Sequence, residues 1–435
     1  MKQIYTSLQK SFATGAPVKF FSVLLYFYLL PAFEGLTEQY IFSFLTVNCG
    51  VGTTTEIFIG TKFFDVGAFG YISFPLLSIQ HMTFDLQPGS GKIFSLSPDV
   101  DSSEDKLNQT LHTAVAISAN EEVVVYGHQR CISGSFRGSA FSVKGIKDLG
   151  TDYWVITHQS KGVSQVGIVS TANNTNVVIN GMYFNKILNL NKYETFYLGG
   201  YYDLTGTHIT SNKPVLVLAG NSADTTPNSG TGYEDSFYEC FPPVRDWERY
   251  FSLVPFPKSN LPFTVKILSV HDRCNIQFDD NSGNLTEVSL GKGKNLDLQS
   301  IGNLTINSSE VILVAQFSQG EYGNAEGGNP SMLLTPPYES ATRNEFIFPV
   351  FGFFEVGRNE RNYIDIWLPP GGQTSDILLD NETVAWQKIG ENINGYTIVR
   401  STLTSYGLHT LQSDTNITAV VYGFGDFRFH AYSLS

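Results

Sequence analysis

The sequence predicts an all-β protein built from four tandem antiparallel β-sandwich-like modules of about 100 residues each. Three observations predict this class. A polar stretch followed by a run of β-branched and aromatic residues occurs four times, at 117–127, 209–220, 306–317 and 413–425. The aromatic content of 14% and the 40 glycines favour strands separated by turns. No window keeps a 3.6-residue apolar period over three helical turns, so no long amphipathic helix is expected.

These four closing segments recur at intervals of about 90 to 110 residues, as expected for one supersecondary unit duplicated along the chain. Their sequences are ISANEEVVVYG, ITSNKPVLVLAG, INSSEVILVAQF and SDTNITAVVYGFG. We expect β modules at residues 36–128, 129–221, 222–320 and 321–435. The alternative arrangement is a closed, propeller-like ring of four-stranded blades, because duplicated antiparallel units also form propellers.

The strand patterns follow the same order in each unit. The first unit is the least regular, with EIFIG, YISFPL and MTFDLQPGSGKIFSL and a polar insertion at 98–110. The later units each contain an opening strand, a hairpin and a closing segment. The opening sequences of the second, third and fourth units are LGTDYWVITH (149–158), FPPVRDWERYFSLVPFP (241–257) and TPPYESATRNEFIFPV (335–350). We therefore expect Trp154 and Trp247 to fill equivalent core positions of adjacent units.

The N-terminal segment predicts secretion. Residues 1–19 carry three lysines and no acidic residue, and the apolar run FFSVLLYFYLL follows at 20–30. A basic region before an apolar core of about 11–14 residues is typical of a secretory signal, whereas a membrane span needs about 20. We expect residues 1–35 to form a signal peptide with Gly35 as the last residue removed, or an uncleaved anchor as the alternative.

The net charge of −13 argues against a nucleic-acid partner and against binding to an anionic membrane, because both need a basic surface. Asn-x-Ser/Thr sequons, which are acceptor sites for N-glycosylation, fit secretion and occur at Asn108, Asn173, Asn284, Asn303, Asn307, Asn381 and Asn416. The four cysteines, which allow three pairings in an oxidising compartment, are Cys49, Cys131, Cys240 and Cys274.

The sequence contains no recognisable catalytic or cofactor motif. No two of the eight histidines lie at i, i+2 or i, i+4, and no phosphate loop or dinucleotide fingerprint occurs. Two acidic segments, 97–105 and 278–284, place hard oxygen ligands at the short spacing that calcium prefers. The calcium candidates in them are Asp99, Asp101, Asp279 and Asp280. Solvated loops between strands are the other interpretation, and we expect no catalytic residue and no cofactor.

Two kinds of loop are expected to differ in role. In the DLTGT turn at 203–207, the side chains of Asp203 and Thr205 satisfy turn amides and Gly206 supplies a positive φ, which indicates a structural turn. The loops at 222–236 and 319–331 are long and rich in Gly, Asn and Ser. Because recognition usually lies in loops on a rigid β scaffold, these two are the predicted recognition loops.

Five segments together resemble the N-terminal domain of the IgGFc-binding protein family. They are LGTDYWV (149–155), NNTNVVI (173–179), DLTGTHITSNKPVLVLAGN (203–221), FPPVRDWERYF (241–251) and GLHTLQSDTNITAVVYGFG (407–425). The resemblance runs from residue 54 to residue 425 and implies a secreted or mucus-associated, β-rich binding domain without enzymatic activity. The family usually has one cysteine just after the AGN segment and another shortly before the Pro-Pro motif. This chain has Ser222 and Glu234 there, so the family's local cross-link is not expected.

The sequence thus predicts a secreted, non-enzymatic binding or adhesion protein that recognises extracellular proteins or glycans at a mucosal or cell surface, with a role in innate defence. One alternative is an extracellular hydrolase, which needs two carboxyl groups about 5 to 10 Å apart. The other is a structural matrix component that associates with itself.

Overall fold

The computed structural model describes residues 35–50, 52–132, 137–225, 234–257, 261–279, 285–319, 329–352, 361–392, 394–425 and 428–434. Throughout these ranges the chain forms antiparallel β-strands joined by turns and short 3-10 helices, so the all-β prediction is confirmed. The segment expected to be a signal or anchor lies outside the described residues, apart from Gly35. No helix in the described ranges is long and apolar enough to cross a membrane.

The first module is a sandwich of two four-stranded sheets. The strand orders are β1-β7-β3-β4 and β5-β2-β8-β9. The elements are β1 (Thr37–Phe42), β2 (Thr53–Thr61), β3 (Ala68–Ser73), β4 (Met82–Leu86), β5 (Gly91–Ser95), η2 (Pro98–Val100), η3 (Glu104–Lys106), β7 (Val115–Ala119), β8 (Val123–Cys131) and β9 (Gly138–Ser142). Aliphatic and aromatic residues of both sheets fill the space between them.

The second module is built around one long strand, β15, that belongs to both of its layers. The first part of β15 pairs with β10 and β12, and its later part pairs with β11 and β16. The elements are β6 (Gln109–Leu111), η4 (Ile146–Asp148), β10 (Gly150–Trp154), β11 (Ser164–Ser170), β12 (Thr175–Asn180), β13 (Asn185–Leu190), β14 (Thr195–Gly200), β15 (His208–Asp224) and β16 (Asp235–Cys240).

The third module repeats this plan around β22. Its first part pairs with β17 and β19, and its later part pairs with β18 and β23. The elements are η5 (Val244–Asp246), β17 (Glu248–Leu253), β18 (Phe263–Ser269), β19 (Cys274–Asp279), β20 (Leu285–Leu290), β21 (Asn295–Ser300), β22 (Leu304–Ser318) and β23 (Ser331–Leu334).

The fourth module again has two sheets, with the orders β24-β29-β26 and β27-β28-β25-β30-β31. The elements are η6 (Tyr338–Ser340), β24 (Glu345–Val350), β25 (Arg361–Leu368), η7 (Thr374–Asp376), β26 (Ile377–Leu379), β27 (Gln387–Glu391), β28 (Thr397–Leu403), β29 (Gly407–Ser413), β30 (Thr418–Gly425) and β31 (Arg428–Ser433).

Each predicted closing segment supplies a central strand, but the conformation of its polar part differs between modules. In the first and fourth modules it divides two strands, β7 from β8 and β29 from β30. In the second and third modules it stays extended, and the chain passes from one layer to the other without a turn. A serine hydroxyl bridges each crossing: Ser211 Oγ donates to Lys213 O at 2.7 Å and Ser308 Oγ to Glu310 O at 2.6 Å.

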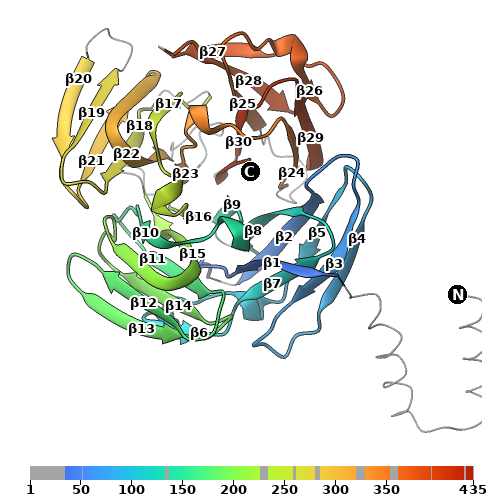
Figure 1. Ribbon diagram of the computed structural model, residues 1–435, viewed down its shortest axis with the longest axis vertical. Coiled ribbons are helices and arrows are strands. Elements are labelled where there is room, and N and C mark those ends of the chain that lie inside the picture. The colour runs from blue at the N-terminus through green and yellow to red at the C-terminus, as the bar shows by residue number, and fades with distance from the viewer. Residues whose placement is uncertain are drawn as a thin grey trace, which may run out of the picture.

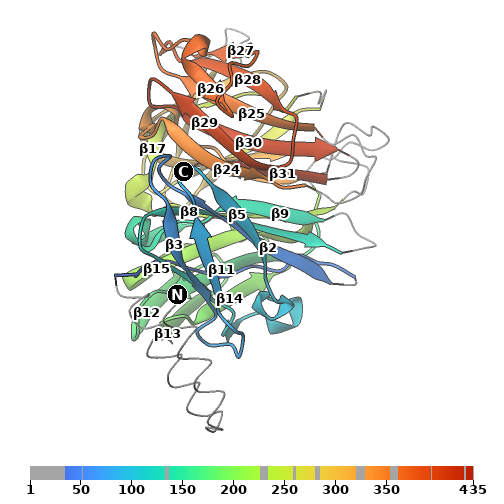
Figure 2. The ribbon, with the colours of Figure 1, turned by 90° about the vertical axis from the view of Figure 1, so that its right-hand side faces the viewer.

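The four modules are grouped around a common centre (Figure 1). The strands nearest the centre are β9, β16, β23 and β31, each of which follows its closing segment and pairs back onto it. These inner strands also pack against one another, and β31 of the fourth module lies against β9 of the first (Figure 2). One hydrophobic cluster accordingly joins residues of the first and fourth modules. The described modules are two-layer sandwiches, and they contain no closed propeller of single-sheet blades.

The predicted equivalence of two tryptophans is wrong, although both side chains are buried in one core cluster. The opening strands β10 and β17 shift register at the same step, between Gly150 and Asp152 and between Glu248 and Tyr250. When β10 and β17 are aligned at this register shift, Trp154 is equivalent to Ser252. In the same alignment Trp247 is equivalent to Leu149, the residue after η4. The sequence similarity of LGTDYW and VRDW concealed this offset.

The prediction for the DLTGT turn is confirmed. Thr205 N donates to Asp203 Oδ1 at 3.0 Å, Thr157 N donates to Thr205 Oγ1 at 3.0 Å, and Gly206 has a φ of +81°. The sequence did not reveal the other partner of this turn. Lys266, a buried residue of the third module, donates from Nζ to Asp203 Oδ2 at 2.6 Å. The turn therefore also ties the second module to the third.

Candidate functional site

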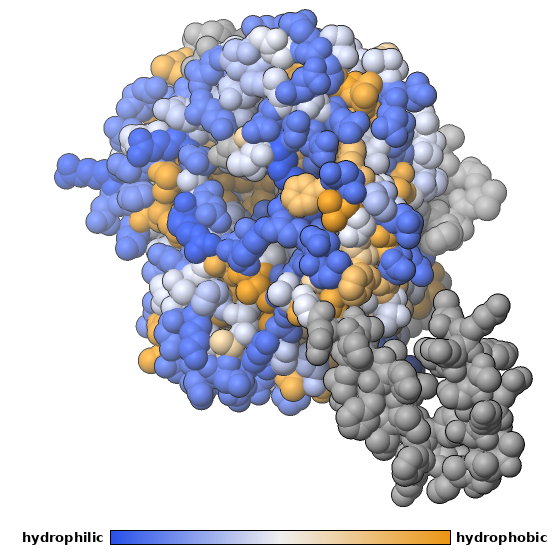
Figure 3. Space-filling model, turned by 45° about the vertical axis from the view of Figure 1, so that its right-hand side comes forward, coloured by the Kyte–Doolittle hydropathy of each residue, from blue (hydrophilic) through white to orange (hydrophobic). Residues whose placement is uncertain are grey.

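A cavity of about 860 Å³ lies where the four inner strands end. The last residues of β9, β16, β23 and β31, with the segments that follow the first three, all contribute to its wall. One face of the molecule is hollowed near its middle, with apolar residues inside a largely hydrophilic surface (Figure 3). Because all four modules line the cavity, its shape depends on how they pack together.

Three of the charged side chains at this cavity form one ion-paired cluster. Glu122 accepts from the ammonium groups of both Lys62 and Lys147. Together the two lysines lower the pKa of the Glu122 carboxyl below its usual range. Arg343 of the fourth module donates from Nη2 to Lys62 O at 3.0 Å and lies over the Phe346 ring. This network closes the first module onto the fourth.

Two further charged groups at the cavity, one acidic and one basic, lie outside this cluster. Glu239, near the end of β16, is 5% exposed, and its Oε1 atom has no hydrogen-bond partner among the described residues. Lys144 follows β9 and is half-buried, and its ammonium group forms no hydrogen bond or ion pair with any part of the chain that the structure describes. Burial raises the pKa of the Glu239 carboxyl well above its usual range, and the charge on Lys144 only partly offsets this effect.

The predicted calcium ligands are not brought together. Asp99 is exposed and accepts from Ser97 Oγ at 2.9 Å. Asp101 instead serves the first module, where it accepts from Thr55 Oγ1 at 2.6 Å and from Gln129 Nε2 at 2.7 Å. Asp279 ends β19, and Asp280 lies outside the described residues. Across the described ranges, no group of three or more His, Cys, Asp or Glu side chains could hold a metal ion.

One histidine site has the residue types of a catalytic triad. His409 Nδ1 lies 2.7 Å from Asp380 Oδ2, and its Nε2 lies 3.4 Å from Ser405 Oγ. However, Nε2 is nearer to the Ser405 backbone oxygen, at 3.0 Å, and a carbonyl only accepts hydrogen bonds. Nε2 therefore carries a proton and cannot take one from the serine, as the base of a triad must. The arrangement anchors a turn.

The structure distinguishes between the three possible cysteine pairings. Cys49 and Cys131 form a disulfide with a Cα–Cα distance of 5.4 Å. Cys240 and Cys274 are buried free thiols. Burial raises the pKa of Cys240 to about 12 and raises the pKa of Cys274, so the reactive thiolate form of both is suppressed.

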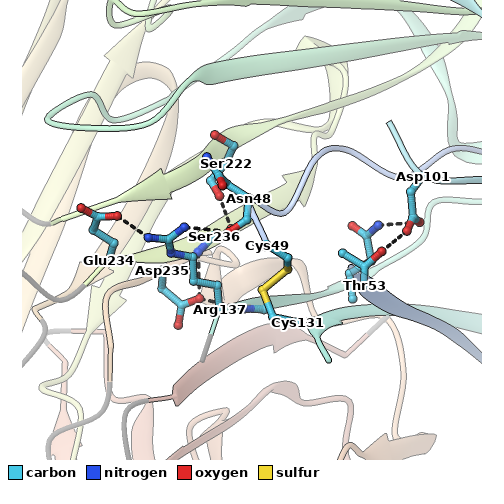
Figure 4. Close-up of a disulfide and its surroundings, with 12 residues drawn as sticks. Asn48, Cys49, Thr53, Asp101, Cys131, Arg137, Ser222, Glu234, Asp235 and Ser236 are labelled. Carbon is cyan, nitrogen blue, oxygen red and sulfur yellow. Dashed lines mark hydrogen bonds and ion pairs between the residues drawn. A yellow bond between two sulfur atoms is a disulfide. The ribbon is translucent and has the colours of Figure 1, made fainter. Parts of the chain in front are cut away.

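The two positions where the family usually has cysteines take part in polar contacts beside this disulfide (Figure 4). Ser222 Oγ donates to Glu104 Oε1 at 2.6 Å, and Ser222 O accepts from Asn48 N at 3.0 Å. Glu234 pairs with Arg137, which also donates from Nη1 to Asn48 O at 2.7 Å. Hydrogen bonds and an ion pair thus hold the ends of β8, β9, β15 and β16 here.

The sequons differ in exposure. Asn284 lies outside the described residues, and Asn303 and Asn307 are half-buried. Asn303 donates from Nδ2 to Ile389 O at 2.9 Å, a contact between the third and fourth modules. The exposed acceptor asparagines are Asn108, Asn173, Asn381 and Asn416.

The predicted recognition loops lie only partly in the described ranges, because 226–233 and 320–328 are outside them. Their described ends meet: Asn329 Nδ2 donates to Glu234 O at 3.4 Å. The two loops connect β15 to β16 and β22 to β23, so their described ends lie at the ends of the inner strands opposite the cavity.

Three comparisons relate the chain to known proteins. No curated protein matches it. A crystal structure of a tetra-tandem repeat in the extending region of a large adhesion protein is 9% identical and covers 85% of this chain and 90% of that chain, but the TM-score of 0.10 supports no conclusion. A family model described as IgGFc binding protein matches residues 139–423. That match spans more than half of the sequence, and the protein belongs to the IgGFc-binding protein family.

Proposed function

We propose that the protein is a secreted, non-enzymatic binding protein that recognises an extracellular protein or glycan at a mucosal or cell surface. The family match over residues 139–423 is the observation that carries this proposal. The Cys49–Cys131 disulfide supports an oxidising compartment, because such bonds persist outside the cytosol. The exposed asparagines of four sequons are accessible to the glycosylation machinery of that route.

We place recognition at the loops 222–236 and 319–331. The hydrogen bond between Asn329 and Glu234 supports this, because it brings the described ends of both loops together on neighbouring inner strands. Two adjacent loops on rigid sandwiches form a larger contact surface than either loop alone. The family name makes the Fc region of immunoglobulin G the first ligand to test.

The test uses the full chain, secreted from a mammalian host and purified in glycosylated form. Its binding to immobilised Fc and to a glycan array is measured over a range of concentrations. We expect saturable binding to at least one of them, and loss of that binding when 226–233 and 320–328 are replaced by Gly-Ser sequences of equal length. The matched control replaces the exposed turn 369–372 in the same way.

Saturable binding that survives the loop replacement would move recognition away from these loops. Absence of saturable binding to both probes, together with concentration-dependent self-association in sedimentation, would contradict the binding function and favour a matrix role.

A further inference from the structure

We propose that the central cavity binds a small carboxylate that also carries hydroxyl groups, such as an acidic sugar residue of an extracellular glycan. Lys144 would hold the carboxylate of this ligand, and Glu239 would hold one of its hydroxyl groups. The inference rests on the proposed function, since it names a substrate class for a glycan-binding protein. It concerns the cavity, which lies at the opposite end of the inner strands from the predicted recognition loops.

The cavity has the size of a ligand site. Small-molecule pockets typically enclose about 300–1,000 Å³, and this cavity has about 860 Å³. Its wall combines apolar side chains, including Trp247, Pro337 and Phe346, with many polar and charged side chains. That combination suits a sugar ring, which has apolar C–H faces and polar edges.

Glu239 offers an unsatisfied polar atom to a ligand in the cavity. A buried polar atom without a hydrogen bond is costly, and native proteins have few of them. Oε1 of this residue is such an atom, and its side chain lines the cavity. A ligand hydroxyl at that position would supply the missing partner. Burial raises the pKa of this carboxyl, which favours its neutral form, and a neutral carboxyl can both donate a hydrogen bond to a hydroxyl group and accept one from it.

Lys144 offers a positive charge to a ligand in the cavity. The other two lysines at the cavity, Lys62 and Lys147, both form ion pairs with Glu122, whereas the Lys144 ammonium group forms no ion pair or hydrogen bond among the described residues. Its charge acts on Glu239, yet no ion pair joins the two side chains. A lysine ammonium group without an ion pair and a buried carboxyl that face one cavity suit a ligand with one carboxylate and neighbouring hydroxyls.

The experiment compares D-glucuronate with D-glucose, which differ by the carboxylate, in calorimetric titrations of the folded full chain. We expect saturable binding of glucuronate and binding of glucose that is weaker by about tenfold or more, since a charge-assisted hydrogen bond contributes at least that factor. Lys144→Met should abolish this preference. Lys106→Met, an exposed lysine on η3 away from the cavity, is the matched control and should preserve it.

Glu239→Gln and Glu239→Leu test the second contact. Glutamine keeps a neutral donor and acceptor and should bind glucuronate within about threefold of the parent, whereas leucine should weaken binding about tenfold or more. Thermal unfolding of each variant shows that it is folded. Equal binding of the two sugars, no glucuronate binding, or an unchanged preference in Lys144→Met would overturn the proposal.

A glycan array then separates the two sources of the sugar. If glucuronate-terminated chains bind and glucose-terminated chains fail to bind, the site recognises glycan ends. If only the free sugar binds, the site recognises a soluble metabolite. The loop replacement at 226–233 and 320–328 should leave glucuronate binding unchanged. Failure of the cavity proposal with intact loop-dependent binding therefore leaves the proposed function standing.

Discussion

At the scale of single residues, a buried ion pair lies at the boundary between the third and fourth modules. Arg400 Nε and Nη2 each lie 2.7 Å from a carboxylate oxygen of Asp365, and Nη2 also donates to Pro255 O at 2.9 Å. Tyr422 donates to the same carboxylate at 2.9 Å. The pair therefore fixes a loop of the third module against the central strands of the fourth.

We predict that Arg400→Met lowers the free energy of unfolding by about 3–5 kcal/mol, because it leaves the Asp365 carboxylate buried without its countercharge. Urea unfolding at pH 7 measures the effect. The double variant Arg400→Met with Asp365→Asn should recover much of the loss, since neither charge then remains. A double variant as unstable as the single one would show that the lost packing of Arg400, and not the stranded charge, is responsible.

A second buried carboxyl predicts a pH dependence. Asp235 Oδ1 accepts from Gly138 N at 2.7 Å and Ser236 N at 2.8 Å, whereas Oδ2 has no partner among the described residues. Burial raises the pKa of this carboxyl well above its usual range, and the two N–H groups offset it only in part. In the unfolded chain the group loses its proton near pH ~4.

From about pH 4 upward, the unfolded state has therefore lost a proton that the folded state retains, and stability falls until the raised folded pKa is passed. Asp235→Asn removes this decline. We predict that the unfolding free energy of the variant, relative to the parent, is higher at pH 7.5 than at pH 4, as measured by urea unfolding at both values. The same relative stability at both pH values would show that Asp235 is ionised in the fold.

At the scale of elements, the sequence predicted those features that depend on local residue order. The closing segments and the DLTGT turn are local, because alternating or continuous apolar runs and Asp, Thr and Gly chemistry determine them. The register of β10 and β17 is not local, since it depends on which residue of β15 or β22 lies opposite. A similar string in both units was therefore no guide to the positions of Trp154 and Trp247.

The candidate site could not be predicted for the same reason. Glu239 and Lys144 are ordinary residues at the ends of two strands in different units, and neither lies in a motif. Only the packing of the inner strands brings them to one cavity. The acidic segments do show a calcium-like spacing of carboxylates in the sequence. However, Asp101 accepts hydrogen bonds from a hydroxyl and an amide group of its own module.

The disulfide stabilises the edge of the first module. It joins the segment after β1 to the end of β8 across 82 residues of sequence. Cross-linking a loop of that length is expected to contribute about 4 kcal/mol, mainly by restricting the unfolded chain. We predict that a reducing agent lowers the urea midpoint of the parent protein but not that of a Cys49→Ser, Cys131→Ser double variant. A midpoint shift in the double variant as well would assign the effect to something other than this bond.

At the scale of the whole molecule, the modules are not independent. The expected unit boundaries at 128/129 and 221/222 fall inside the closing strands β8 and β15, and the boundary at 320/321 falls just after β22. Each boundary therefore assigns the inner strand to the unit after the closing strand with which it pairs. We propose that each inner strand belongs to the preceding module and supplies its contact with the others. Because the inner strands pack together, unfolding of one module exposes apolar surface on its neighbours.

The contact between the last and first modules tests this coupling. Tyr432 of β31 is fully buried, its ring lies 5.2 Å from that of Tyr126 of β8, and its hydroxyl donates to Pro349 O. We predict that Tyr432→Ala lowers the free energy of unfolding by about 3–5 kcal/mol, as for other large aromatic residues in a core. Tyr201→Ala, which removes a tyrosine that is 73% exposed, should change it by less than about 0.5 kcal/mol.

Calorimetry of the Tyr432→Ala variant measures the consequence for the assembly. If β31 joins the fourth module to the first, the parent protein unfolds in one transition and the variant in two, because the weakened module separates before the others. The central cavity, which β31 also lines, should lose its ligand over the first of these transitions. A single transition at lower temperature in the variant would instead mean that the remaining inner strands are enough to keep the four modules cooperative.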